Sequence, residues 1–363
     1  MPSLLLFLLG LAALAAGAEA LVRGASRLAT SVGVSPLVIG LTVVAWGTGS
    51  PEMAVSVDAA LGGQADVVLG NVVGSNILNV LFILGASAVI VPLAVHQQLV
   101  RLDVPIMIGV SIVMLALASD GRIGRGEGGM LLAGLLVYTG VVIWMGRRES
   151  AAVAQEYAAE VAIRAGRPHG WAPDVLQVAI GLALLAVGAH TLIAAATDIA
   201  RSLGVSELVI SLTLVAAGTS MPEIATSIMA AVRGDRDIAV GNVVGSNIFN
   251  ILAVLGAAAA VAPDGVMVSA AVRTFDMPVA IAVAAVCLPI SASGAAIARW
   301  EGGVLLAYYV AYVSYLYLDA TQHAATGAYT RIMLTVVLPL TAITLGVMFT
   351  RSVLASRRAR APS

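Results

Sequence analysis

Long apolar stretches follow one another along almost the whole chain, separated by short loops that carry glycine, arginine and aspartate. A helix needs about 20 apolar residues to cross the hydrocarbon of a bilayer. Hydrophobic residues make up 60% of the 363 residues and charged residues only 11%, which is far from the composition of a soluble domain. The sequence therefore predicts an all-α polytopic membrane protein with little chain left for a soluble domain.

Hydropathy predicts eleven transmembrane helices, at residues 3–22, 34–61, 66–93, 104–118, 128–146, 173–197, 205–232, 237–262, 273–290, 302–318 and 332–350. The first has an apolar core and an end that resemble a signal peptide. However, residues 17–34 match residues 188–205, where no signal peptide could lie. We therefore expect the first stretch to remain as a transmembrane helix.

The chain contains an internal repeat. LVIGLTVVAWGTGSPEMAVS at 37–56 aligns with LVISLTLVAAGTSMPEIATS at 208–227, and GNVVGSNILNVL at 70–81 with GNVVGSNIFNIL at 241–252. The offset is constant at 171 positions, the difference between Glu52 and Glu223. Because each copy holds an odd number of helices, the second copy enters the membrane from the opposite side, so the two are inverted repeats.

The repeats divide the chain into residues 1–146 (first repeat), 147–172 (cytoplasmic linker), 173–318 (second repeat) and 319–363 (an extra transmembrane helix and a basic tail). All 19 basic residues are arginine, and an N-terminus outside the cell places fourteen of them in the cytoplasm. Basic residues favour the cytoplasmic side. We expect a multi-pass protein of the cell inner (plasma) membrane with the linker and C-terminus in the cytoplasm.

Each repeat carries one glutamate in the middle of its second helix, Glu52 and Glu223. A carboxylate at that depth is costly and normally faces a cavity or a partner. No arginine lies at a comparable depth in any predicted helix. A bound cation or protons are therefore the expected partners of the two glutamates.

Prolines precede both glutamates. Pro51 and Pro222 have no N–H, so the carbonyls of Gly47 and Gly218 lose their helical donor. Broken helices at membrane depth occur beside protein or water, where the freed carbonyls can bind cations. Where the helix persists, Thr48 lies one turn before Glu52, on the same face.

The third helix of each repeat adds neutral oxygens. Ser75 and Asn79 in the first copy, and Ser246 and Asn250 in the second, share a four-residue spacing. Together with the glutamates they form an all-oxygen cage without His or Cys, which suits hard cations. Calcium takes 6–8 oxygens in a flexible shell, whereas magnesium dehydrates reluctantly. Two glutamates neutralise one divalent ion, and the same cage could hold several sodium ions instead.

The paired GTSxPE-like and GNxxGSNxxN-like motifs resemble the two alpha repeats of the cation/calcium antiporter superfamily, most closely its prokaryotic sodium/calcium exchanger branch. The resemblance implies ten helices in two inverted halves and alternating access, in which the first and sixth helices slide across a fixed core. It also implies that calcium and sodium bind as transported substrates, with no cofactor and no enzymatic activity.

Position by position, the resemblance implies that the ion sites use the side chains of Glu52, Glu223, Thr48, Thr219, Ser220, Ser75, Ser246, Asn79 and Asn250 and the carbonyls of Ala45 and Ala216. Two features depart from the family pattern. Gly49 stands where the first repeat usually has serine, and whether Ser50 substitutes for it is open at this point. Asparagine occupies both 79 and 250, where some members carry an aspartate in the second copy.

We therefore expect an antiporter that exchanges calcium for sodium. A proton-coupled calcium exchanger and a cation channel are the alternatives. An intramembrane enzyme is disfavoured, because the sequence has no paired aspartates, no Ser/His pair and no metal-binding His cluster. The lipid bilayer is an expected partner and nucleic acid is not, since the net charge is only −1. The oligomeric state is left open.

Overall fold

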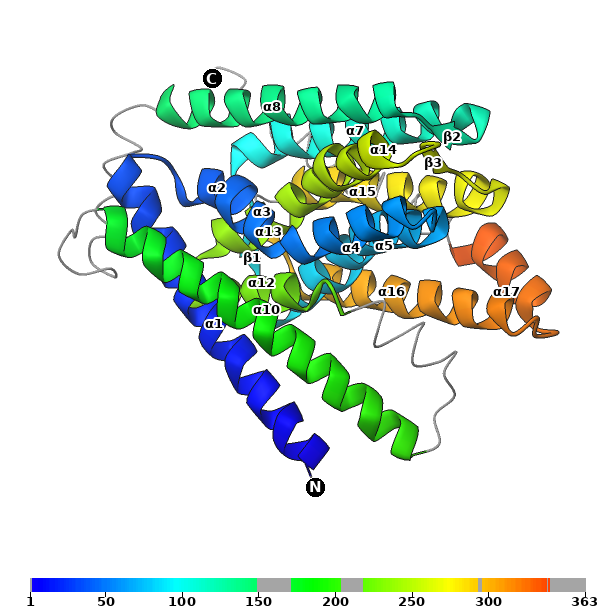
Figure 1. Ribbon diagram of the computed structural model, residues 1–363, viewed down its shortest axis with the longest axis horizontal. Coiled ribbons are helices and arrows are strands. Elements are labelled where there is room, and N and C mark those ends of the chain that lie inside the picture. The colour runs from blue at the N-terminus through cyan, green and yellow to red at the C-terminus, as the bar shows by residue number, and fades with distance from the viewer. Residues whose placement is uncertain (1, 149–170, 204–217, 293–295, 338, 340–363) are drawn as a thin grey trace, which may run out of the picture.

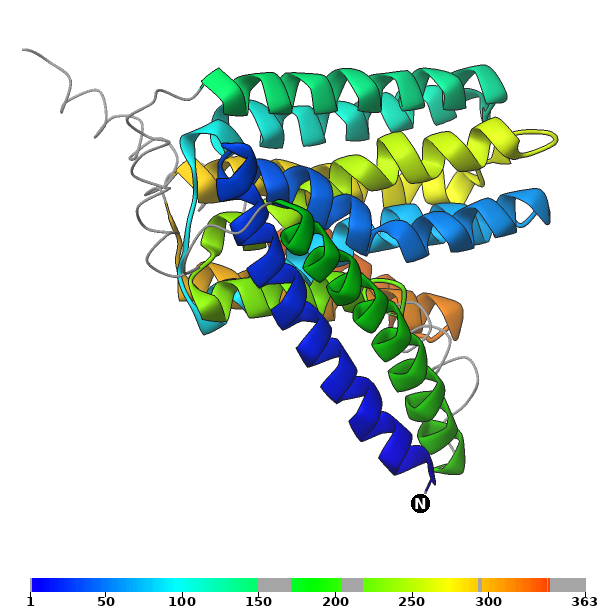
Figure 2. The same cartoon turned by 60° about the vertical axis from the view of Figure 1, so that its left-hand side comes forward.

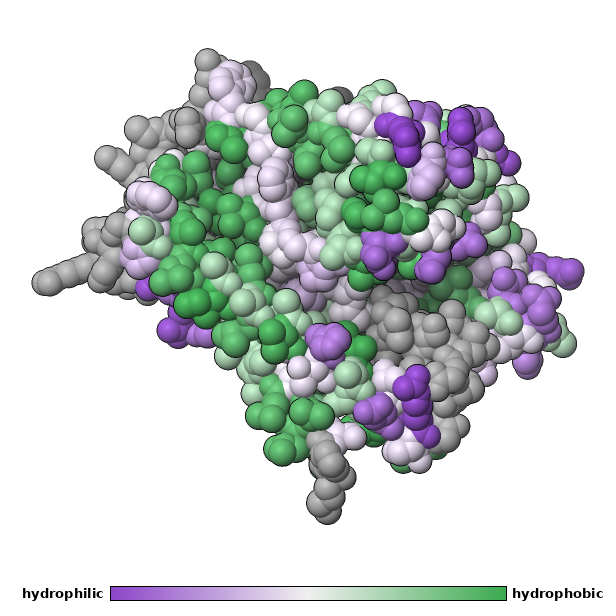
Figure 3. Space-filling model, viewed as in Figure 1, coloured by the Kyte–Doolittle hydropathy of each residue, from purple (hydrophilic) through white to green (hydrophobic). Residues whose placement is uncertain are grey.

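Helices form nearly all of the structure, a computed structural model that describes residues 2–148, 171–203, 218–292, 296–337 and 339 (Figure 1). Within these described residues, seven helices are long and apolar enough to cross a membrane. Large apolar side chains such as Leu136 (71% exposed) and Val187 (62% exposed) lie on the outside. Figure 3 shows hydrophobic residues spread over α1 and α10 and hydrophilic residues gathered toward the right-hand edge. Such a surface fits contact with lipid.

The first repeat begins with α1 (Pro2–Val32). Its second helix is divided into α2 (Pro36–Ile39), a π-helical segment (Gly40–Val44), α3 (Ala45–Thr48) and α4 (Ser50–Leu61). The rest comprises α5 (Ala65–Leu78), a π-helix (Asn79–Leu84), α6 (Gly85–Ile90), a π-helix (Leu99–Asp103), α7 (Val104–Leu117), a 3₁₀ turn (Ala118–Asp120) and α8 (Arg125–Arg148).

The second repeat follows the same order. It comprises α10 (Trp171–Ser202), α12 (Met221–Arg233), α13 (Arg236–Phe249), a π-helix (Asn250–Leu255), α14 (Gly256–Val261), a π-helix (Val272–Asp276), α15 (Met277–Ala292) and α16 (Arg299–Ala320). The chain continues in α17 (Thr326–Ile332) and a π-helix (Met333–Val337). Most of the linker, residues 205–217 of the seventh predicted helix and most of the eleventh lie outside the described residues.

Two short antiparallel strand pairs join the repeats at their loops. β1 (Leu93–Ala94) pairs with β4 (Ala296–Ile297), and β2 (Arg122–Ile123) pairs with β3 (Val266–Met267). In each pair one strand comes from each repeat. The predicted topology places the members of each pair on the same side of the membrane, so the pairings agree with it.

α1 and α10 pack side by side and antiparallel, inclined to the remaining helices (Figures 1 and 2). Their contact is backbone to backbone. A Cβ added to Gly17 would lie 2.8 Å from the amide nitrogen of Leu185, and one added to Gly181 would lie 2.6 Å from that of Leu21. Small residues let membrane helices approach this closely, so α1 and α10 form one closely packed pair.

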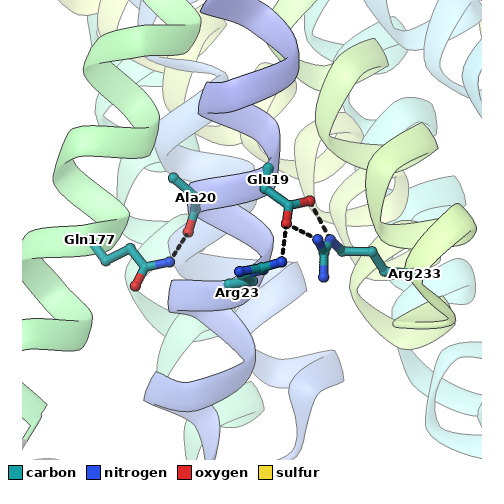
Figure 4. Close-up of polar contacts among 5 residues, drawn as sticks. All are labelled: Glu19, Ala20, Arg23, Gln177 and Arg233. Carbon is teal, nitrogen blue, oxygen red and sulfur yellow. Dashed lines mark hydrogen bonds and ion pairs between the residues drawn. The ribbon is translucent and has the colours of Figure 1, made fainter. Parts of the chain in front are cut away.

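Both long helices extend beyond their predicted ends at residues 22 and 197. The extension of α1 is stabilised by charged pairs: Glu19 pairs with Arg23 and Arg233 (Figure 4), and Arg27 pairs with Asp174 at 3.2 Å. Hydropathy treats these charges as the end of a membrane helix. In the structure they bind one another, so the helix continues past them.

The centre of the molecule is formed by α5 and α13. Every residue of α13 from Ile238 to Phe249 is buried, and most of α5 from Val68 onward is buried as well. α13 packs against the divided second helix and against α12. The two repeated motifs therefore meet in the interior.

Candidate ion-binding site

Both glutamates stand at the start of a half-helix. Gly49 (φ −77°, ψ 0°) separates α3 from α4, and Ser220 (φ −87°, ψ 6°) precedes α12. Glu52 and Glu223 consequently lie in the first turns of α4 and α12, where the helix dipole favours negative charge. Their side chains are buried, and the two carboxylates interact electrostatically with each other. The break predicted at the first proline is present at Gly49; at the second proline residues 218–220 form a turn before α12, and the residues that precede this turn lie outside the described residues.

The backbone at the breaks keeps some of its hydrogen bonds. The Gly49 N–H donates to the Ala45 carbonyl at 3.0 Å, and the Met221 N–H donates to the Gly218 carbonyl at 3.3 Å. A carbonyl oxygen has two lone pairs, so the Ala45 carbonyl can still bind an ion. Its counterpart Ala216 lies outside the described residues.

The glutamate of each repeat lies beside hydroxyl groups of the other repeat. Ser220 Oγ donates to Glu52 Oε1 at 3.0 Å, and Thr219 of the same loop also interacts with Glu52. Thr48 interacts with Glu223 rather than with Glu52. The helix does not persist between Thr48 and Glu52, because it is broken at Gly49, so the shared face expected along an unbroken helix does not form. Each carboxylate is surrounded by groups of the opposite repeat.

Four asparagines join the halves across the pseudo-twofold axis. The side-chain amides of Asn76 and Asn247 each donate to the other's backbone carbonyl, both at 3.3 Å. Asn79 Nδ2 donates to Asn247 Oδ1 at 2.9 Å, and Asn250 Nδ2 donates to Asn76 Oδ1 at 3.1 Å. With both amide groups engaged, the Oδ1 atoms of Asn79 and Asn250 are fixed in place.

A second pair of asparagines supports the glutamate loops. Asn71 Nδ2 donates to the Glu52 carbonyl at 3.1 Å, and Asn71 Oδ1 accepts from Thr219 at 3.2 Å. Asn242 Oδ1 accepts from Thr48 at 3.3 Å. Sequence reasoning did not single out Asn71, Asn242, Asn76 or Asn247. All four belong to the GNVVGSN motif that occurs in both repeats, and this identity was the available signal.

Several oxygens around the glutamates are buried without a hydrogen-bond partner. Among the described residues they are Glu52 Oε2, Glu223 Oε2, Asn79 Oδ1, Asn250 Oδ1, Ser246 Oγ and Thr226 Oγ1. A buried oxygen without a partner costs about 1–3 kcal/mol. None of the ion pairs in the described part of the chain involves Glu52 or Glu223. Carboxylate, amide and hydroxyl oxygens of this kind can be satisfied together by a hard cation.

The asparagine positions coincide with a change in helix geometry. α5 becomes a π-helix at Asn79, and α13 becomes one at Asn250. π-Helical turns are rare and frequently mark functional sites. Both third helices therefore widen at the residue that presents a free amide oxygen.

Ser50 does not replace the hydroxyl that is absent at position 49. Its side chain is exposed, and its Oγ donates to the Trp46 carbonyl at 2.9 Å. The other predicted side chains, Ser75, Ser220, Ser246, Thr48 and Thr219 among them, are buried or half-buried in the cage.

Residues 2–144 and 174–318 match the family model of the sodium/calcium exchanger protein. The chain belongs to the sodium/calcium exchanger family. The family match covers both repeats and leaves out the linker, and it confirms the resemblance expected from the paired motifs.

Relatives of the exchanger match it along most of their length. It is 37% identical to the putative antiporter CaxA of Alkalimonas amylolytica over 86% of this chain and 96% of the relative. It is 32% identical to the sodium/calcium exchanger MaX1 of Methanosarcina acetivorans over 86% of this chain and 98% of the relative. A solved structure of the sodium-calcium exchanger NCX_Mj superposes with a TM-score of 0.74 at 30% identity, covering 86% of this chain and 98% of the other. The exchanger is therefore a membrane transporter and not an enzyme.

Proposed function

We propose that this exchanger, a secondary antiporter of calcium against sodium, binds both ions in turn in the oxygen cage around Glu52 and Glu223. The observation that carries the proposal is the set of buried carboxylate, amide and hydroxyl oxygens that have no partner within the described protein. Four of these oxygens, on Glu52, Glu223, Asn79 and Asn250, come from equivalent positions of two inverted repeats, as expected for a site that opens alternately to each side of a membrane.

In the calcium-bound state, Glu52 and Glu223 together neutralise the divalent ion. Calcium takes 6–8 oxygens, so a subset of the neutral ligands completes its shell. The neutral ligands are the side-chain oxygens of Thr48, Thr219, Ser220, Ser75, Ser246, Asn79 and Asn250 and the carbonyls of Ala45 and Ala216. When sodium enters, the same oxygens divide into smaller groups around each carboxylate. The ions are the transported substrates, and transport requires no other cofactor.

Access to the cage follows the half-helices. α1 packs against α12, and Thr226 of α12 is 0% exposed. The equivalent residue of α4, Val55, is 40% exposed. We infer that ions reach the cage along α4 in this conformation, and along α12 once α1 and α10 move together. With the N-terminus outside a plasma membrane, the open path faces the cell exterior.

Uptake of radioactive calcium into proteoliposomes tests the coupling. Vesicles loaded with sodium are diluted into sodium-free medium, and matched vesicles receive a pH gradient of the same size or no gradient. The proposal predicts rapid uptake with the sodium gradient alone. Uptake driven only by the pH gradient would identify a proton-coupled exchanger. Flux at channel rates without any gradient would contradict alternating access.

A further inference from the structure

Phe249 contacts both Gly49 and Trp46, and the two repeats differ at all three of these positions. At the repeat offset, the residues of the first half correspond to those of the second as Gly49 to Ser220, Trp46 to Ala217 and Leu78 to Phe249. We call the oxygens around each glutamate one half of the cage. The Glu52 half has Ser220 and Leu78 at these positions, and the Glu223 half has Gly49 and Phe249.

In the Glu52 half the serine hydroxyl links both repeats. Ser220 Oγ, which is buried, donates its single proton to Glu52 Oε1 at 3.0 Å. Ser75 Oγ lies 3.1 Å away and must therefore be the donor to Ser220. A carboxylate and two hydroxyl oxygens are thus held together.

In the Glu223 half a phenylalanine ring occupies the corresponding space. A Cβ added to Gly49 would lie 2.8 Å from Cδ1 and 3.0 Å from Cε1 of Phe249. The ring is buried and packs against Trp46, with ring centroids 5.9 Å apart. Because the ring is enclosed, it cannot turn aside easily to admit a side chain at position 49.

The consequence is visible at the serine of the third helix. Ser75 Oγ is bonded to Ser220, whereas its counterpart Ser246 Oγ is buried and has no hydrogen-bond partner. One oxygen of each glutamate, Glu52 Oε2 and Glu223 Oε2, lacks a partner in both halves, so the difference between the halves lies at this serine. The Glu223 half is one hydroxyl short, and Ser246 Oγ, the counterpart of the bonded Ser75 Oγ, remains unpaired.

We propose that the contact between Gly49 and Phe249 sets the balance between sodium and calcium by weakening the sodium site of the Glu223 half. This inference rests on the proposed function. A sodium ion in one half depends on one carboxylate and the neutral oxygens beside it, so one lost hydroxyl is a large part of its shell. Calcium draws on both carboxylates and on oxygens of both halves, so the same loss affects it less. The two sodium sites are consequently unequal.

The double variant G49S/F249L gives the Glu223 half the same serine and leucine that the Glu52 half has. It is expected to raise the apparent sodium affinity in calcium exchange roughly tenfold, the factor that corresponds to ~1.4 kcal/mol. The apparent calcium affinity should change much less. G49S alone places the new Cβ against the ring and should gain no sodium affinity. F249L alone should gain none either, because it adds no oxygen.

The mirror variant S220G provides an independent test that does not depend on repacking. It removes the hydroxyl from the intact half and should lower the apparent sodium affinity roughly tenfold, with a smaller effect on calcium. Thermal melting of each purified variant shows whether it is folded. S220G decides the question if G49S/F249L does not fold.

The outcomes separate the inference from the proposed function. A wild-type protein without sodium-dependent calcium flux overturns both. A wild-type protein that exchanges the two ions, with sodium dependence unchanged in G49S/F249L and in S220G, overturns the inference alone. An equal loss of sodium and calcium affinity in S220G also overturns it, because the hydroxyl would then serve both ions alike.

Discussion

Arg233, the last residue of α12, pairs with Glu19 of α1 (Figure 4). The pair joins one of the two long helices to the half-helix that carries Glu223. At the repeat offset the equivalent residues are His190 and Gly62, which cannot form such a pair. The ion pair therefore fastens α1 to the core at one end of the molecule only, the end at which α12 is covered.

The difference in exposure between α4 and α12 predicts one-sided labelling. Cys287 is the single native cysteine and is buried, so C287A provides the background. In that background V55C should react with a charged, membrane-impermeant thiol reagent added outside the cell. T226C should react slowly from either side. Rapid labelling of T226C with a protected V55C would show that the open path runs along α12 instead.

Loss of the ion pair should uncover α12. E19Q, or R233Q, is expected to increase the labelling of T226C severalfold from the cytoplasmic side, because one attachment of α1 to α12 is removed. Both side chains are more than a quarter exposed, and exposed pairs contribute only about 0–1 kcal/mol. The double variant E19Q/R233Q should resemble the single variants. Additive increases would indicate that the two residues act separately.

The close packing of α1 on α10 predicts a strong dependence on residue size. In G181A the new methyl group meets the backbone of α1, and such overpacking costs about 1–3 kcal/mol. G140A in α8 is the matched control, since nothing lies within 4 Å of its added Cβ. Thermal melting in detergent should show a clear loss of stability for G181A and none for G140A. Equal melting temperatures of the two variants would argue against close packing of α1 on α10.

Asn247 is predicted to be a positioning residue. It holds the amide of Asn79, whose Oδ1 faces the cage, so N247A should raise the KM for calcium about tenfold by an effect of ~1.4 kcal/mol. S87A is the control, because Ser87 is also buried but has no hydrogen-bond partner. A lower melting temperature with an unchanged KM would show that Asn247 serves stability alone.

The sequence predicted Glu52 and Glu223 as the centre of the candidate site, because a carboxylate without a basic partner at membrane depth has few explanations. It did not predict which repeat surrounds which carboxylate. Spacing within one helix places Thr48 near Glu52, whereas the break at Gly49 turns it toward Glu223. Contacts such as Ser220 with Glu52 arise only when the two copies are packed together.

The ends of the long helices and the cause of the asymmetry at Gly49 could not be predicted either, because both depend on contacts between distant parts of the chain. Hydropathy takes no account of the ion pair between Arg27 and Asp174, so the predicted first helix ends too early. The missing hydroxyl at Gly49 was evident from the repeat, but the Phe249 ring that fills the space beside it lies 200 positions away in the chain, 249 − 49.

The central claim is that Glu52 and Glu223 together hold the transported calcium ion. E52Q and E223Q keep the shape of each side chain and remove its charge, whereas D58N removes an exposed charge from the same helix as Glu52. Sodium-driven calcium uptake by proteoliposomes that contain equal amounts of folded protein should be abolished in E52Q and in E223Q and preserved in D58N. Full uptake in either glutamate variant would contradict the account.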